Sequence, residues 1–286
     1  MAHKVFVAFL IFIVITAVVA LGAHGLNYYL TPLHERTFRS DYEVMKPSAS
    51  YGLGLGIVGA LLITVGVSTY SSRKRVRALW NLGKLSRWLE FHIFLCLLGP
   101  VLVVYHTTFK TGGIAGLSLW TMLAVVASGL IGRFLYVQIP RNKRGNELSA
   151  AQISSELQQL SERIASSPLG SQIIRRMEES FAALPKPESL SETVRVLLHL
   201  HGIRKQVRTS VLAFISGRTQ SRHVARELYR VAATRALLQQ KSLMLTQVEK
   251  LFHYWHAVHL PFSIIMFITL AAHVTATILF GYSWIF

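Results

Sequence analysis

Five long apolar segments follow one another along the chain, and more polar stretches separate them. Each segment approaches the length of about 20 residues that a membrane-spanning helix needs once its flanks are included. The pattern therefore predicts an all-α integral membrane protein with a bundle of five transmembrane helices. The first segment, with Lys4 ahead of it, also resembles a signal peptide, but we expect it to be retained as a helix. The predicted segments are residues 5–21, 51–70, 91–105, 114–131 and 260–280.

The stretch between the fourth and fifth segments is polar and predicts a helical insertion. Ile153, Leu157, Leu160 and Ile164 recur at helical intervals. The part from about 222 to 250 has neither Gly nor Pro, and we expect it to run directly into the fifth membrane helix. Two interpretations stay open: a helical hairpin packed on itself, or a docking surface for another subunit, since a membrane helix pair rarely needs so long a connection. The predicted division is 1–139 for four transmembrane helices, 140–250 for the insertion and 251–286 for the fifth helix.

Basic residues predict the orientation. The chain has 286 residues and a formal net charge of +17, although only 15% of its residues are charged. The loop between the third and fourth segments has only Lys110, whereas the loop before it and the stretch after the fourth segment are strongly basic. The positive-inside rule then places the N-terminus and residues 140–250 inside, in the cytoplasm beneath a bacterial inner membrane, and the C-terminus outside. Because topology explains the charge, nucleic-acid binding is not expected. The basic residues concerned are Arg73, Lys74, Arg75, Arg77, Lys84, Arg87, Arg141, Lys143 and Arg144.

Two other patterns exclude common cofactor sites. Cys96 is the only cysteine, so a CxxCH haem attachment, an iron–sulfur cluster and a zinc-finger framework lack their ligands. Residues 54–59 read Gly-Leu-Gly-Ile-Val-Gly, which matches the dinucleotide-binding motif GxGxxG. That motif requires a preceding strand, and here it lies inside an apolar segment. We therefore expect these glycines to serve close helix packing.

Four histidines in the third and fifth segments share one spacing. His92 and His106 are 14 residues apart, and so are His259 and His273. Fourteen residues span about 21 Å of helix and four turns of a supercoiled helix, so both members of a pair can face the same way. Both helices run from inside to outside, which matches His92 with His259 near the inner face and His106 with His273 near the outer face. This pattern predicts two bis-histidine haem sites, one above the other.

The chemistry of imidazole supports this prediction. Two neutral imidazoles fill both axial positions of a haem iron and suit it to electron transfer. His256 shares a helix face with His259 and is the alternative ligand, although its spacing to His273 would be 17 residues. If His259 is the ligand, His256 is expected either to serve a quinone or a haem propionate or to lie among the lipid headgroups. Arg133, near the inner end of the fourth segment, is expected either to bind a propionate or to extend to the membrane surface.

On the residues His92-x13-His106 and His259-x13-His273, the chain resembles the di-haem membrane cytochromes b. It is similar to the ferric-reductase-like transmembrane domain, whose third and fifth helices carry paired haem ligands, and to the cytochrome b subunits of quinone-linked dehydrogenases. The resemblance covers residues 51–140 and 250–286. It implies two b-type haems, an electron-transport role in a respiratory chain, and a quinone as a further ligand. The chain differs from the ferric-reductase-like domain in its insertion of about 110 residues and in showing neither a sixth membrane helix nor a flavin or nicotinamide domain.

These observations predict a cytochrome b subunit that carries electrons across the bilayer between the quinone pool and partner redox subunits of an oxidoreductase complex. Two alternatives remain. A stand-alone quinol-driven metalloreductase would expose an outer haem edge and be active as an isolated chain. A haem-free scaffold or transporter would use the histidines for protons or metal and would purify colourless.

Overall fold

The structure is a computed structural model that describes residues 2–140, 148–167, 169–182, 189–198, 205, 209, 212–213 and 222–280. All regular structure in these residues is helical, which confirms the predicted all-α class. Among them, five helices are long and apolar enough to cross a membrane. The predicted integral membrane architecture with five candidate spans is therefore confirmed.

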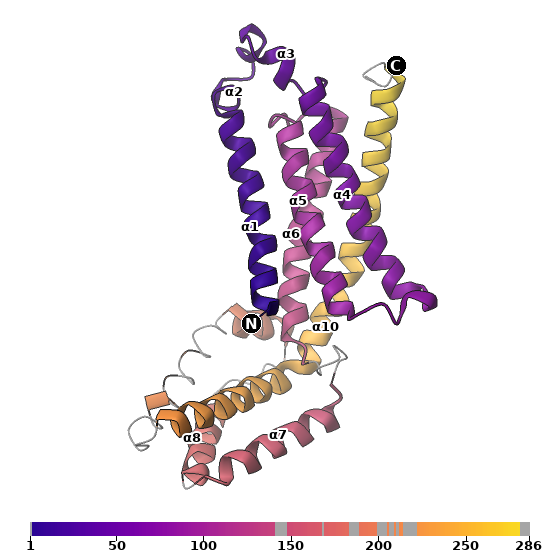
Figure 1. Cartoon of the computed structure of the whole chain (residues 1–286). Helices are drawn as coiled ribbons and strands as arrows, with labels where there is room; N and C mark the ends of the chain where they lie inside the picture. Colours follow the sequence, from indigo (N-terminus) through magenta and orange to yellow (C-terminus); the bar gives the residue numbers. More distant parts are fainter. Residues whose placement is uncertain are drawn as a thin grey trace. The chain divides into compact units, whose positions relative to one another are not determined.

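The chain divides into two compact units, Met1–Ile131 with Ala257–Phe286, and Gly132–His256. The first unit contains the apolar helices α1, α4 and α5, which lie side by side (Figure 1), together with the parts of α6 and α10 that belong to it. The fifth apolar segment is the end of one helix that begins at Arg222, so the prediction that the insertion runs directly into it is confirmed. The helix bounds are α1 Ala2–His24, α4 Ser50–Arg75, α5 Leu85–His106, α6 Gly113–Gln138 and α10 Arg222–Leu279.

Helices α4 and α5 approach each other so closely that their backbones touch. A Cβ atom built on Gly59 would lie 2.8 Å from the carbonyl oxygen of Gly99, and one built on Gly99 would lie 2.7 Å from that of Gly59. No side chain fits at such distances, so only glycine permits this approach. The GxGxxG run is thus part of a helix-packing surface inside α4, as the sequence predicts.

Helices α6 and α10 pack into the same bundle through apolar and hydroxyl contacts. Leu119 and Met122 of α6 and Met266 of α10 form a buried cluster with Ile63 of α4. The Thr121 and Thr269 hydroxyls lie 3.1 Å apart across α6 and α10. A hydroxyl pair of this kind satisfies polar groups that lipid would leave without partners.

Short elements join the long helices of this unit at both ends. Between α1 and α4 the chain forms α2 Leu26–Leu30, a 3-10 turn η1 Arg36–Phe38 and α3 Tyr42–Met45. We call residues 25–49 the connecting segment. A second 3-10 turn, η2 Arg77–Leu79, joins α4 to α5.

The second unit has its own apolar core. Helix α7 Ala150–Ala165 begins at a capping box, in which Ser149 and Gln152 bond each other's backbone N–H groups, and helix α8 spans Gly170–Ala182. Ile164 of α7 packs with α8 and with the first part of α10. The predicted amphipathic face of α7 is confirmed, since Ile153 and Ile164 are buried and Leu157 and Leu160 are half-buried. Residues 190–198 are also helical.

Candidate functional site

Helix α4 holds both histidines of α5 through backbone carbonyl groups. The Nδ1 atom of His92 lies 3.0 Å from the carbonyl oxygen of Gly66, and that of His106 lies 2.8 Å from the carbonyl oxygen of Gly52. A carbonyl oxygen only accepts hydrogen bonds, so Nδ1 must donate in both cases. Each imidazole is thereby fixed as the tautomer whose Nε2 carries the lone pair. That nitrogen is the one able to ligate a metal.

The α4–α5 pair has a single antiparallel register along its length. Gly52, Gly59 and Gly66 are spaced seven residues apart, and they lie opposite His106, Gly99 and His92. The 14-residue spacing of the histidines is therefore matched by a 14-residue spacing of their carbonyl partners. Sequence reasoning missed these partners, although a glycine at every seventh position of the second apolar segment was a visible signal.

Small residues also leave room beside the histidine rings. A Cβ atom built on Gly56 would lie 2.9 Å from two ring atoms of His106. On α6, a Cβ atom built on Gly129 would lie 3.9 Å from Cε1 of His259. Any side chain at Gly56 would push the His106 ring away from its carbonyl partner.

His259 and His273 lie on the less exposed face of α10. His259 and His273 are half-buried, while Val258 and Val274 beside them are exposed. The Nδ1 atom of His259 lies 3.1 Å from the Ser128 hydroxyl of α6. As in the histidines of α5, the Nδ1 atom of His259 faces a neighbouring helix.

The two predicted outer ligands come from α5 and α10. His106 and His273 lie within electrostatic range of each other. The pairings of His106 with His273 and of His92 with His259 remain predictions.

This donor set fits a haem better than a bare metal ion. No group of three or more His, Cys, Asp or Glu side chains able to hold a metal ion occurs in the described part of the chain. A haem needs only two axial protein ligands because the macrocycle supplies the others. Half-buried imidazoles on α5 and α10, those of α5 with tautomers fixed through Nδ1, have the chemistry required.

Two further predicted residues, Arg133 and His256, lie in the second unit. The Arg133 guanidinium is half-buried and stacks over the ring of Tyr136, 5.6 Å from its centroid. His256 is exposed and its ring centroid lies 5.8 Å from that of Trp255. Their relation to the four histidines stays a prediction.

Comparison with known proteins adds no further assignment. No protein-family model, curated protein or solved structure matches the chain.

Proposed function

We propose that the chain is a di-haem cytochrome b subunit that carries electrons across a membrane, between a quinone pool and partner redox subunits of a respiratory complex. One observation carries the proposal. His92 and His106, 14 residues apart on α5, are both fixed by carbonyl groups of α4 in the tautomer that can ligate iron. A histidine present only to join two helices would need neither the matching spacing nor a second matched pair on α10.

The protein's part in this function is to hold its ligands rigidly. A metal-ligating histidine usually donates its second ring N–H to a carbonyl or carboxylate, which orients the ring and raises its basicity. The carbonyls of Gly52 and Gly66 fill that role, and the hydroxyl of Ser128 is placed to do so for His259. Two b-type haems would supply one-electron carriers that change redox state with little rearrangement.

The spacing of the ligands explains how electrons would cross the bilayer. A separation of 14 residues places the two ligand levels about 21 Å apart along the helices. This distance is about two thirds of the hydrocarbon thickness of a bilayer, which is about 30 Å. One level then lies near each membrane face. We further propose that Arg133 binds a propionate at the inner level and that His256 serves a quinone or a propionate there.

We also propose the orientation that the basic residues predict, with the N-terminus and residues 140–250 in the cytoplasm of a bacterial cell. Protease added to the outer face of sealed cells or spheroplasts should leave residues 140–250 intact, because Arg141, Lys143 and Arg144 directly follow the fourth apolar segment and favour retention of this end inside. Opening the membrane should then permit cleavage. Fragments that appear while the membrane is still sealed would contradict this orientation.

The proposed partnership is tested by gentle extraction, native mass measurement and reduction by quinol. We expect the chain to copurify with at least one other redox subunit and its haems to be reduced by a quinol. A lone protomer that passes electrons from quinol directly to soluble ferric or cupric ions would favour the metalloreductase instead. A protein whose haems quinol does not reduce would contradict the link to the quinone pool.

A further inference from the structure

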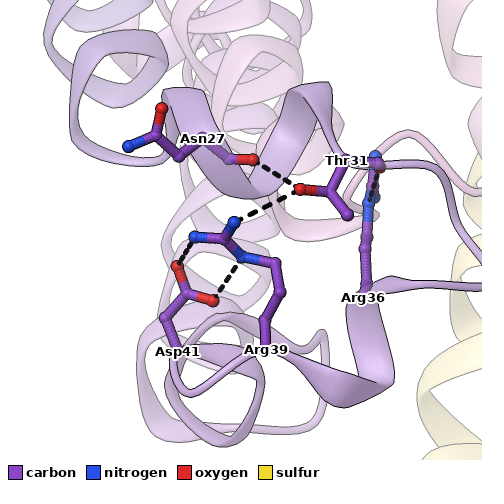
Figure 2. Close-up of polar contacts among 5 residues, drawn as sticks. All are labelled: Asn27, Thr31, Arg36, Arg39 and Asp41. Atoms are coloured by element: carbon purple, nitrogen blue, oxygen red, sulfur yellow. Dashed lines mark hydrogen bonds and ion pairs between the residues drawn. The ribbon is translucent and has the colours of Figure 1, made fainter.

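The connecting segment between α1 and α4 contains an arginine that is almost completely buried. Arg36 is only 5% exposed. Its guanidinium donates three hydrogen bonds to backbone carbonyls, from Nε to Thr31 at 2.8 Å, from Nη2 to Tyr29 at 2.8 Å and from Nη1 to Thr108 at 2.6 Å. Since a guanidinium has five N–H groups, two of them remain for another acceptor. Figure 2 shows Arg36 beside Thr31.

The acidic residues of the connecting segment are paired with other cations. Asp41 accepts two hydrogen bonds from Arg39, at 2.8 and 2.7 Å (Figure 2). The Arg39 guanidinium, bonded to the Asp41 carboxyl, holds the pKa of that carboxyl below its usual value. Glu43 pairs with Lys46, and Glu35 lies 3.4 Å from a ring nitrogen of His34. Among the described residues, no carboxylate lies within ion-pair distance of Arg36.

The tyrosines near Arg36 do not supply the missing negative charge. The Arg36 guanidinium stacks over the ring of Tyr28, 5.1 Å from its centroid. Burial raises the pKa of the Tyr28 hydroxyl despite the nearby guanidinium. Burial, with smaller effects of neighbouring tyrosines, raises the pKa of Tyr29 to about 12. Both phenols are therefore neutral at physiological pH.

Two residues that touch Arg36 carry buried hydroxyl groups without a partner. Tyr28 is 1% exposed and Thr108 is 0% exposed. Within the described residues, neither hydroxyl has a hydrogen-bond partner. Buried polar groups are usually satisfied, and each exception calls for an explanation. A buried cation that contacts the ring of Tyr28 and the backbone of Thr108, two residues with unsatisfied hydroxyls, points to an anionic acceptor.

The position of this cluster relates it to the candidate outer site. Thr108, whose carbonyl accepts from Arg36, is only two residues after His106. Thr108 and Phe109 have φ angles of 50° and 64°, a backbone conformation that residues other than glycine rarely adopt. The chain therefore turns sharply just after the ligand-bearing helix and is held there by Arg36.

We propose that Arg36, with the hydroxyls of Tyr28 and Thr108, binds a carboxylate of the group held by His106 and His273, namely a propionate of the outer haem. This inference rests on the proposed function. A guanidinium is the side chain best suited to a carboxylate, because its planar donors match the two carboxylate oxygens. The propionate would provide the negative charge that the connecting segment lacks around Arg36.

The test compares Arg36→Gln with Arg39→Gln in the intact, haem-loaded protein. Both variants remove one positive charge from the same segment, but Arg39 already has Asp41 as its partner. A cation near a haem disfavours the ferric form, so losing it should lower the midpoint potential. The outer haem is identified as the one that the His273→Ala variant loses. We expect Arg36→Gln to lower the midpoint potential of this haem by about 59 mV or more, which is a tenfold change in the one-electron equilibrium. Arg39→Gln should leave it unchanged.

Four further results would contradict either the role of Arg36 or the proposed function. Two retained haems with unchanged potentials in Arg36→Gln would overturn it. A shift seen in nanodiscs with anionic lipid but absent in zwitterionic lipid would also overturn it, because the headgroup of an anionic lipid would then be the anion. If Arg36→Gln does not fold, Tyr28→Phe removes a hydroxyl alone and should lower the same potential by a smaller amount; no shift there would overturn the proposal. Absence of haem from the wild-type protein would instead refute the proposed function.

Discussion

Replacing Gly59 by leucine is expected to abolish binding of both haems. A Cβ atom at this position would lie 2.8 Å from the Gly99 carbonyl oxygen and 3.2 Å from the Val103 backbone nitrogen. These are backbone atoms, which cannot rotate away as a flexible side chain would. Helices α4 and α5 would have to separate, and the carbonyls of Gly52 and Gly66 would then lose His106 and His92. Overpacking a core ordinarily costs about 1–3 kcal/mol, and the loss here should reach or exceed the upper figure.

The matched control for this prediction is Gly54→Ala in the same helix. A Cβ atom built on Gly54 has no heavy atom within 4 Å, and alanine favours a helix over glycine by about 1 kcal/mol. We therefore expect Gly54→Ala to keep full haem content. The measurement is haem per chain after purification, together with the temperature at which each variant aggregates in detergent. A Gly59→Leu protein that retains two haems would show that the close α4–α5 contact does not position the ligands.

Single replacements of the four histidines by alanine are expected to reduce haem content from two per chain to one. An alanine leaves one axial position empty and, for His92 and His106, removes a hydrogen bond to a carbonyl of α4, which contributes about 0.5–1.5 kcal/mol. Replacement of His92 or His259 should remove the inner haem, and replacement of His106 or His273 the outer one. Because the two levels are about 21 Å apart, the second haem should remain at least partly bound.

His253→Ala is the control for these variants. His253 lies on α10, six residues before His259, and is exposed. Its replacement should leave two haems per chain. The reduced-minus-oxidised spectrum of each variant, with a haem determination, checks the result. Unchanged haem content in any of the four ligand variants would show that this histidine is not an axial ligand.

The long helices could be predicted from the sequence because their signals are local. The length and apolar composition of each segment are enough to predict a long helix there. The absence of Gly and Pro between about 222 and 250 indicated that α10 continues without a break. The face of α7 was equally visible, since Ile153 and Ile164 recur at helical intervals. Such patterns need no knowledge of which elements pack together.

The partners of the histidines could not be predicted, because they are backbone groups. The register of α4 against α5 determines that the carbonyls of Gly52 and Gly66 face His106 and His92. Every residue has a backbone carbonyl, so residue type does not indicate which one will accept a hydrogen bond. Only the repeat of Gly52, Gly59 and Gly66 hinted at a packing face.

The sequence also did not reveal that Arg36 has no carboxylate partner among the described residues. Its segment looks nearly balanced in charge, with three basic residues and three acidic ones. Local geometry decides the outcome, because Asp41 pairs with Arg39 two residues away while Arg36 turns toward carbonyl groups. A charge sum along the chain cannot distinguish a paired arginine from a buried unpaired one.

Whether the four histidines hold two haems can be read from the haem-to-protein ratio of the purified wild-type chain, recorded with its reduced-minus-oxidised spectrum. We expect two b-type haems per chain, both with the spectrum of bis-histidine iron. A single haem would contradict the two-level arrangement. A colourless protein that does not take up haem would contradict haem ligation by these histidines and would favour a haem-free scaffold or transporter.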